Sequence, residues 1–214
     1  MTKTAAEACR QQSEGYHRHF PDCPTMTSTQ LASWMDRCPS SSEVRYKTED
    51  GAPVHLVDVR TSPERRVSVI PGSVPLRHFE ATVAPALSED ATIVCYCTVG
   101  YRSGMACRRL RETHGLSSGR VRNLDGVVAY THAVREASGA DRDGTRVPHL
   151  VDGRTGEACH RVHVFGPQWD FAAEGFRTIK FSFAQVCLRG AMQAGRDLAF
   201  CIVRAFNFTR KKSD

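Results

Sequence analysis

The chain lacks several features by which large classes of protein are identified from sequence. Its first 15 residues are polar and contain Glu7 and Glu14, so they predict no secretory signal and argue against a mitochondrial presequence. No basic stripe with interleaved aromatic residues is present, which argues against a nucleic-acid-binding protein. Four charges inside the C-terminal run of residues 181–208 argue against a membrane-spanning helix. What remains is a globular protein whose function must be carried by local motifs.

The composition is that of a soluble globular protein with free thiols. The chain has 214 residues, 41% of them hydrophobic and 24% charged, which suits one ordinary domain with extensions or two small domains. A net charge of +6 allows anionic small substrates or a membrane surface as partners. Nine cysteines without a secretory signal predict thiols in a reducing compartment rather than a disulfide framework. We therefore expect a cytoplasmic protein, with peripheral membrane contact or an organelle left open.

Two groups of residues have the side chains of metal ligands, but neither has the spacing of a metal site. The first group consists of Cys9, His17, His19 and Cys23. It shows neither Cys-x-x-Cys nor His-x-x-x-His spacing, so we interpret residues 1–27 as an exposed arm. The second group consists of Cys159, His160 and His163. In a strand, alternation would place the middle residue on the opposite face from the other two, so we expect no metal there.

The sequence is organised around residues 93–104, where a short strand leads through a loop into a helix. Residues 93–96, Ile-Val-Cys-Tyr, form the apolar strand. The helical pattern begins at Ser103, the expected N-cap, and Gly115 ends it. Cys97 therefore lies at the carboxyl end of a strand, where open α/β sheets place their chemistry. Loop N–H groups and the helix dipole favour a thiolate, so the sequence predicts Cys97 as the reactive cysteine.

The stretch from Cys97 to Ser103 resembles the active-site loop of rhodanese (sulfurtransferase) domains. In that family, the loop cysteine accepts a sulfane sulfur and becomes a persulfide. Four residues separate Cys97 from Arg102, whereas the phosphatases that share this fold have five, so the shorter loop argues against phosphate esters. The resemblance assigns catalysis to Cys97. It assigns substrate contacts or bracing of the loop to Thr98, Val99, Gly100, Tyr101 and Arg102.

Other segments resemble further rhodanese signatures. A strand at residues 54–59 ends in Asp58-Val-Arg60, and residues 70–73 are Ile-Pro-Gly-Ser where the family has Ile-Pro-Gly-Ala. Asp58 and Arg60 are expected to be structural, forming a buried hydrogen-bonded pair near the site. Residues 123–126, Asn-Leu-Asp-Gly, resemble the family's Asn-Leu-x-Gly-Gly but lack its second glycine. This departure is expected to alter the loop beside the site slightly.

Strands that alternate with short helices predict a doubly wound, parallel α/β sheet flanked by helices, and the resemblance implies the same fold. It further implies a sulfurtransferase that moves a sulfane sulfur from thiosulfate or a persulfide to a thiol, protein or cyanide acceptor through a Cys97 persulfide. No metal or organic cofactor and no nucleic acid are implied. The alternative is a non-catalytic rhodanese-fold binding module tethered by its C-terminal helix. A protein phosphatase is third, because of the loop length.

We expect four segments along the chain. They are an N-terminal arm (1–27), a rhodanese-like domain that contains all the chemistry (28–136), a linker with a β-hairpin (137–180), and an amphipathic helix with a basic tail (181–214). The hairpin prediction depends on the turn sequence Asp-Gly-Arg-Thr-Gly at residues 152–156. The apolar face of residues 181–208 is expected to cover the domain or a partner, to mediate self-association, or to lie in a membrane interface.

Overall fold

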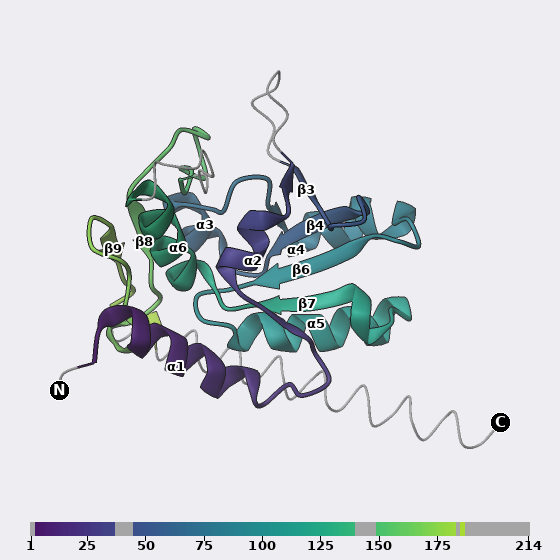
Figure 1. The fold of residues 1–214 in the computed structure, drawn as a ribbon, viewed down its shortest axis with the longest axis horizontal. Coiled ribbons are helices and arrows are strands. Elements are labelled where there is room, and N and C mark those ends of the chain that lie inside the picture. The colour runs from purple at the N-terminus through teal and green to yellow at the C-terminus, as the bar shows by residue number, and fades with distance from the viewer. Residues whose placement is uncertain (1–2, 37–44, 140–148, 183–184, 187–214) are drawn as a thin grey trace. The chain divides into compact units, whose positions relative to one another are not determined.

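The computed structural model describes residues 3–36, 45–139, 149–182 and 185–186. A seven-stranded sheet forms its centre, with strand order β1-β7-β6-β4-β3-β2 and with β5 pairing β4 beyond the end of β3. The strands of this sheet are β1 (Thr25–Met26), β2 (Met35–Asp36), β3 (Arg45–Lys47), β4 (Pro53–Asp58), β5 (Val74–Pro75), β6 (Thr92–Tyr96) and β7 (Val121–Leu124). All pairs are parallel except β2 with β3 and β3 with β4. This arrangement confirms the predicted α/β fold (Figure 1).

The central strands are apolar on both faces because helices cover both. On β6, Ile93 and Cys95 pack with helix α5, while Val94 and Tyr96 pack with helix α6. All five residues of β6 are buried, as expected of a parallel strand between two layers of helices. Figure 1 shows β4, β6 and β7 side by side with α5 alongside β7. The carboxyl end of β6, where Cys97 follows, is therefore held from both sides.

The helices begin and end close to their sequence signals. They are α1 (Ala5–His17), α2 (Ser28–Ser33), α3 (Ser62–Val67), α4 (Leu76–His78), α5 (Tyr101–His114) and α6 (Val127–Gly139). A capping box at Thr27 begins α2, and Gly115, in the left-handed conformation, ends α5 as predicted. Between α4 and β6, the chain forms a π-helical turn (Phe79–Val83) followed by a 3₁₀ turn (Ala84–Ala86).

The N-terminal segment is part of the fold, so the interpretation as an exposed arm was wrong. A capping box at Thr4 begins α1, which contacts α5 and α6. Strand β1 then pairs with β7 at the edge of the sheet. Cys9, Phe20 and Cys23 are each at most 3% exposed. Sequence patterns gave no sign of this packing because residues 1–27 have few apolar side chains, and those few meet partners a hundred residues away.

The predicted hairpin is confirmed, but it is held by a single antiparallel bridge instead of full strands. Val151 and Ala158 make an antiparallel bridge around the turn at residues 152–156. Beyond it, β8 (Arg161–His163) and β9 (Arg177–Ile179) pair in parallel, which the sequence did not predict. The residues between these strands include a 3₁₀ turn at Pro167–Trp169. They pack near the carboxyl end of the central sheet, since Phe165 contacts Arg102 and Trp169 contacts Tyr16.

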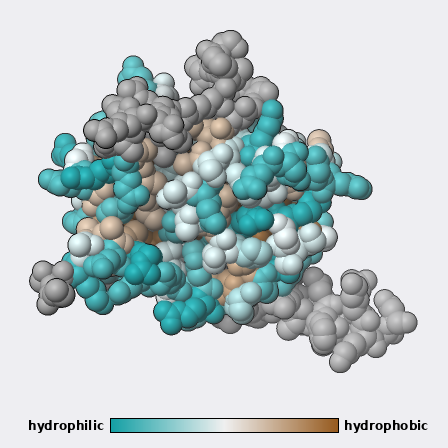
Figure 2. Space-filling view, viewed as in Figure 1, coloured by the Kyte–Doolittle hydropathy of each residue, from teal (hydrophilic) through white to brown (hydrophobic). Residues whose placement is uncertain are grey.

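The chain divides into two compact units, Met1–Ile179 and Lys180–Asp214. The predicted amphipathic helix at residues 181–208 lies almost entirely outside the described residues. Within the described part of the chain, no helix is long and apolar enough to cross a membrane. On the face shown in Figure 2, hydrophilic residues cover most of the described surface, and apolar residues are visible only in small areas.

Candidate active site

The Cys97 loop follows β6 directly and ends in the first turn of α5. Helix α5 begins at Tyr101, two residues earlier than predicted, with Gly100 as its N-cap residue. Gly100 has a φ of +99°, a conformation that glycine adopts without strain. Ser103 is therefore not the cap, and that prediction was wrong. Its hydroxyl lies inside the loop instead.

The carbonyl groups of the loop are turned away from Cys97 by three hydrogen bonds. The Cys97 and Thr98 carbonyls accept from the first N–H groups of α6, those of Val127 (2.9 Å) and Val128 (3.3 Å). The Gly100 carbonyl accepts from the amide of Asn123 at 2.9 Å. Because the N–H of a trans peptide points opposite to the C=O of the same peptide unit, these bonds turn the N–H groups of Thr98, Val99 and Tyr101 away from α6 and Asn123. Backbone N–H groups gathered in a loop stabilise negative charge.

Gly126 allows α6 to approach the loop this closely. A Cβ atom at this position would lie 2.4 Å from the Thr98 carbonyl oxygen, and the φ of Gly126 is +114°. Only glycine fits both restrictions. The position of the absent second glycine is occupied by Val127, which is fully buried and still donates its N–H to Cys97. The departure from Gly-Gly therefore leaves the contact between α6 and the loop in place.

Two donors point at the Cys97 sulfur itself. The Gly100 N–H donates to Sγ at 3.2 Å, and the Ser103 hydroxyl donates to it at 3.4 Å. Cys97 is 1% exposed and sits beside the N-terminus of a 14-residue helix, whose dipole favours an anion there. Cys95 and Cys107 are also buried, but they pack in the apolar cluster between α5 and the sheet, away from the loop interior.

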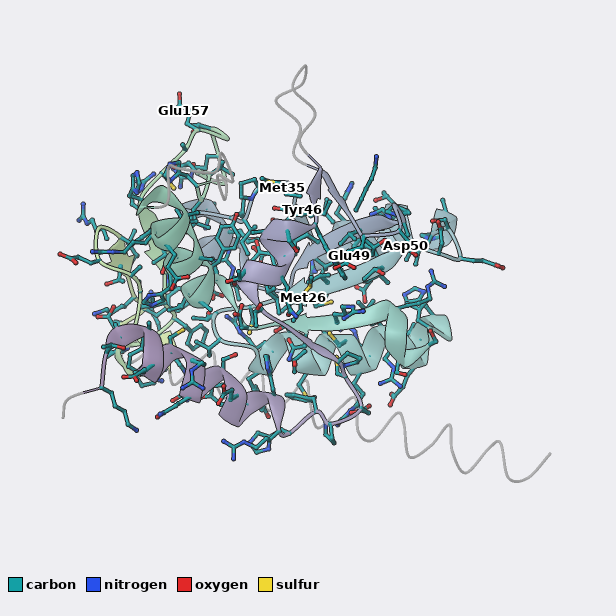
Figure 3. All side chains as sticks on the ribbon, in the orientation of Figure 1. Met26, Met35, Tyr46, Glu49, Asp50 and Glu157 are labelled. Atoms are coloured by element: carbon teal, nitrogen blue, oxygen red, sulfur yellow. The ribbon has the colours of Figure 1, made fainter. Side chains whose placement is uncertain are left out.

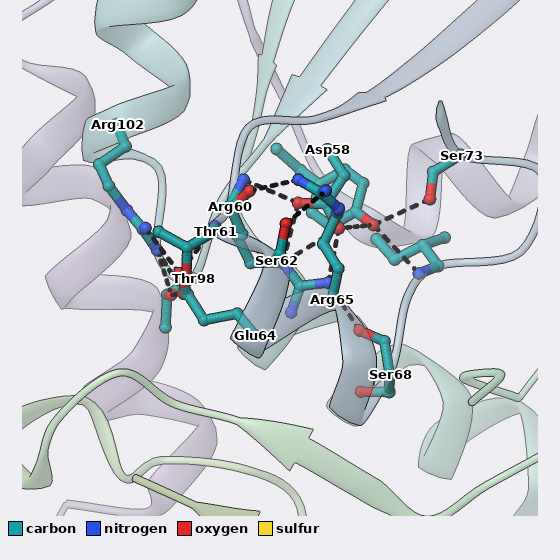
Figure 4. Close-up of polar contacts among 12 residues, drawn as sticks. Asp58, Arg60, Thr61, Ser62, Glu64, Arg65, Ser68, Ser73, Thr98 and Arg102 are labelled. Atoms are coloured by element: carbon teal, nitrogen blue, oxygen red, sulfur yellow. Dashed lines mark hydrogen bonds and ion pairs between the residues drawn. The ribbon is translucent and has the colours of Figure 1, made fainter. Parts of the chain in front are cut away.

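Arg102 is held by a buried carboxylate rather than pointing at the sulfur. Its two terminal nitrogens donate to Glu64 at 2.6 and 2.9 Å, and one of them also donates to the Thr98 hydroxyl at 3.0 Å (Figure 4). Glu64 is fully buried, and it also accepts from the N–H and the hydroxyl of Thr61. The Phe165 ring lies over the guanidinium, 4.8 Å from its carbon to the ring centroid. In this geometry Arg102 braces the loop.

The charges of this cluster are mutually stabilised. Burial alone raises the pKa of the Glu64 carboxyl, but the charge and hydrogen bonds of Arg102, together with the charge of Arg60, hold it well below its usual range. Burial alone lowers the pKa of Arg102, and the Glu64 charge raises it above its ordinary value. Both groups therefore stay ionised at neutral pH, and the loop is tied to α3 by a charged bidentate pair.

Asp58 and Arg60 form a second buried pair beside the site. The Arg60 guanidinium donates to both Asp58 oxygens, at 2.6 Å for the shortest contact, and also to the Ser68 carbonyl at 2.8 Å. The Tyr96 hydroxyl donates to Asp58 at 2.6 Å. Ser73, which stands where the family has alanine, lies 2.9 Å from that same hydroxyl. These contacts tie β4, β6 and the turn after α3 together and contain no group that reaches Cys97.

Residues from both ends of the described chain cover the loop. Residues 97–100 are all buried. Tyr101, at 39% exposure, packs edge-on against Tyr16 of α1, and the Trp169 indole donates to the Tyr16 hydroxyl at 3.1 Å. Phe165, whose φ of +64° is unusual for a bulky residue, completes this cover over Arg102.

Two cavities lie near the sheet, at different places. One of about 570 Å³ lies at the amino ends of the strands, lined by Trp34 and Arg122 together with Met26, Glu49 and Asp50, which Figure 3 labels. The other, of about 450 Å³, lies between α1, α2 and α6 and includes His17 and Asp125. Among the described residues, no three His, Cys, Asp or Glu side chains are placed to share a metal ion.

Sequence reasoning missed four residues that contact the loop or its brace. The sequence patterns assign no role at the site to Glu64 or Phe165, and they indicate only a helix cap for Ser103 and an incidental position for His17. The Thr-x-x-Glu spacing of Thr61 and Glu64 was a visible signal, but for a capping box. No local pattern could reveal that His17 and Phe165 meet a loop about 80 and 65 residues away.

One family model matches the part of the chain that contains this site. Residues 40–130 match the family model of the rhodanese-like domain. Among solved structures, a rhodanese-like domain protein from Staphylococcus aureus is 22% identical, covers 50% of this chain and 90% of its own, and has a TM-score of 0.35. A protein from Staphylococcus saprophyticus is 23% identical over 50% of this chain and 92% of its own (TM-score 0.34).

A third solved structure is a protein of unknown function from Rhodopseudomonas palustris, described as a possible tyrosine phosphatase. It is 19% identical, covers 62% of this chain and 92% of its own, and has a TM-score of 0.35. No curated protein matches the chain. The family match, the strand-loop-helix around Cys97 and the Asp58–Arg60 pair agree with one another, and residues 40–130 therefore form a rhodanese-like domain.

Proposed function

We propose that the protein is a sulfurtransferase that carries a sulfane sulfur on Cys97. The Cys97 thiolate attacks the outer sulfur of a donor such as thiosulfate, sulfite leaves, and Cys97 becomes a persulfide. A thiophilic acceptor, such as a thiol, a protein or cyanide, then takes the outer sulfur and releases the Cys97 thiolate. No metal or organic cofactor takes part in this scheme.

The observation that carries the proposal is the set of donors around one sulfur. The Gly100 N–H and the Ser103 hydroxyl both point at Cys97 Sγ, while three loop carbonyls are bonded outward. This arrangement supports a negatively charged sulfur at the start of α5. Because Arg102 is already satisfied by Glu64, it is a poor partner for the oxygens of a phosphate ester. The short loop and the occupied arginine both favour sulfur over phosphate.

The test is turnover of thiosulfate and cyanide to thiocyanate, combined with mass spectrometry of the Cys97 peptide after thiosulfate treatment. The wild-type protein should gain one sulfur on Cys97 and produce thiocyanate. Cys97→Ser should abolish both, whereas Cys159→Ser, which changes a partly buried cysteine away from the loop, should abolish neither. Wild-type rates in Cys97→Ser, or robust phosphatase activity in the wild-type protein, would overturn the proposal.

The alternative, a non-catalytic rhodanese-fold binding module, is favoured by one observation. Cys97, Thr98 and Val99 are each at most 4% exposed, so a substrate reaches the sulfur only if the cover moves. A binding module would show no extra sulfur on Cys97 even after long exposure to thiosulfate. A sulfurtransferase would show it within the time of the turnover assay.

A further inference from the structure

A histidine from outside the matched domain lies directly against the Cys97 loop. His17 is the last residue of α1. A Cβ atom built on Gly100 would lie 2.6 Å from His17 Nε2 and 3.0 Å from its Cδ2, so the ring rests against the Gly100 backbone. The N–H of Gly100 is the group that donates to Cys97 Sγ at 3.2 Å. Gly100 therefore lies between His17 Nε2 and Cys97 Sγ and contacts both.

The hydrogen bonds of the ring fix which nitrogen is available. Nε2 is buried and has no hydrogen-bond partner among the described residues. The backbone of Leu124 raises the pKa of His17, which indicates that it faces the ring. With the proton on Nδ1, the unpartnered Nε2 carries the lone pair of the neutral ring.

The ring is neutral at physiological pH. Burial lowers the pKa of His17, and this effect outweighs the Leu124 bond and the charge of Glu14, which both raise it. The result lies below the ordinary value of about 6.5. Nε2 is thus an unprotonated, unpartnered base at pH 7, next to the loop that would hold the persulfide.

The same ring borders a space that a small molecule can occupy. The cavity of about 450 Å³ between α1, α2 and α6 has His17 and Ser13 in its wall, and these are the two side chains that a Cβ at Gly100 would meet. Its volume falls in the range of small-molecule sites, about 300–1,000 Å³. The His17 ring therefore lies between this cavity and the Cys97 loop.

We propose that His17 is the base that removes the proton from an acceptor thiol, an inference that rests on the sulfur transfer proposed above. Nε2 takes the proton of the thiol, and the thiol sulfur forms a bond to the outer sulfur of the Cys97 persulfide anion. The bond between the two sulfurs of the persulfide breaks, and its electron pair leaves with Cys97 as a thiolate. The acceptor departs as a persulfide anion, and the imidazolium releases its proton to solvent.

Other titratable groups surround His17 and must be distinguished from it. They are Glu7, Cys9, Arg10 and Glu14 on α1, Asp125, His132 and Glu136 in and before α6, and Cys97 in the loop that the ring contacts. Asp125 is the main rival, because burial raises its pKa to about 6 even though Ser28 hydrogen-bonds the carboxylate. An Asp125→Asn variant separates the two groups.

The experiment measures kcat/KM for persulfide discharge against pH with two acceptors, L-cysteine and the sulfite dianion. The thiol must lose a proton, and the sulfite dianion has none to lose. With the wild-type protein, the thiol rate should stay level from the thiol pKa, about 8.5, down to below pH 6.5, because His17 acts on the protonated thiol. Asp125→Asn should keep this level region.

His17→Gln should lower the thiol rate at pH 7 about 100-fold, the lower range for a general base, and the loss should disappear in alkali, where the thiolate forms without help. The rate with sulfite should change less than about 3-fold, a difference of about 0.6 kcal/mol. An equal loss with both acceptors at every pH would show a structural role, and no loss at all would remove His17 from the reaction.

Either of those results would overturn the inference. If His17→Gln does not fold, the wild-type profile decides: a thiol rate that falls in proportion to the thiolate fraction below pH 8.5 would refute the base. If the wild-type protein gains sulfur on Cys97 but shows that proportional fall, the role of His17 as a base is refuted and the sulfurtransferase function is not. If the wild-type protein gains no sulfur on Cys97, both the sulfurtransferase function and the role of His17 are refuted.

Discussion

Replacing Glu64 with glutamine should destabilise the protein far more than the loss of an ordinary ion pair. Glu64 is fully buried and accepts two hydrogen bonds from Arg102, whose side chain is 16% exposed. Removing one partner of a buried pair costs about 3–5 kcal/mol, because the other charge remains buried without compensation. Water can reach part of Arg102, so we expect the lower end, about 3 kcal/mol.

Urea denaturation followed by tryptophan fluorescence measures this change. With an m-value of about 2 kcal/mol/M, a loss of about 3 kcal/mol lowers the midpoint by about 1.5 M. Glu80→Gln is the matched control, because Glu80 also pairs with an arginine at 2.6 Å but is 31% exposed. That control should cost less than about 1 kcal/mol.

The pH dependence gives a second check with a definite sign. The pKa of Glu64 is lower in the folded protein than in the unfolded chain, so its contribution is complete above the unfolded value of about 4.3 and is lost as the pH falls toward the folded value. The stability gap between wild type and Glu64→Gln should therefore narrow below about pH 4.3. A variant within about 1 kcal/mol of wild type at pH 7, or a gap that stays constant in acid, would refute the reasoning.

Two further predictions concern α6 and the C-terminal segment. Gly126→Ala should lower the free energy of unfolding by more than about 2 kcal/mol in urea denaturation and should impair sulfur transfer. Its Cβ would lie 2.4 Å from the Thr98 carbonyl oxygen, at a φ of +114°. The control Gly119→Ala, whose Cβ would have nothing within 4 Å, should do neither, and equal effects of the two substitutions would refute the packing argument. We also propose that the segment after Ser182, with the basic run at residues 210–212, mediates self-association or contact with anionic membranes. Truncation after Ser182 should leave a folded, active protein in circular dichroism and turnover assays that no longer sediments with anionic vesicles or self-associates, and an unfolded product would contradict this.

The sequence predicted the central sheet and the Cys97 loop because both are local patterns. The apolar residues 93–96 form a strand that is buried on both faces when helices pack on both sides of the sheet. The glycines at positions 100 and 126 indicate turns at the two ends of the site. These features depend on side chains within a few residues of each other, which a sequence displays directly.

The surroundings of the loop depend on contacts between distant residues, and they could not be predicted. Glu64 and Arg102 are 38 residues apart, and each alone fits a solvent-exposed helix as well as a buried pair. The cover formed by α1 and Phe165 joins segments on both sides of the matched domain. Neither segment is strongly apolar, so hydrophobic periodicity gave no sign that they pack on the same site.

The two-residue strand β1 has a consequence for where this domain can be cut. In the described part of the chain, β1 and β2 form the two edges of the central sheet, and each contains only two residues. Short edges offer few unpaired backbone groups to another molecule. A protein that began at residue 28 would lose β1 and expose the edge of β7, where the N–H of Asn123 now donates to the Pro24 carbonyl. Such a fragment would present the four-residue strand β7 as an unpaired edge to its neighbours, and aggregation would be its first failure.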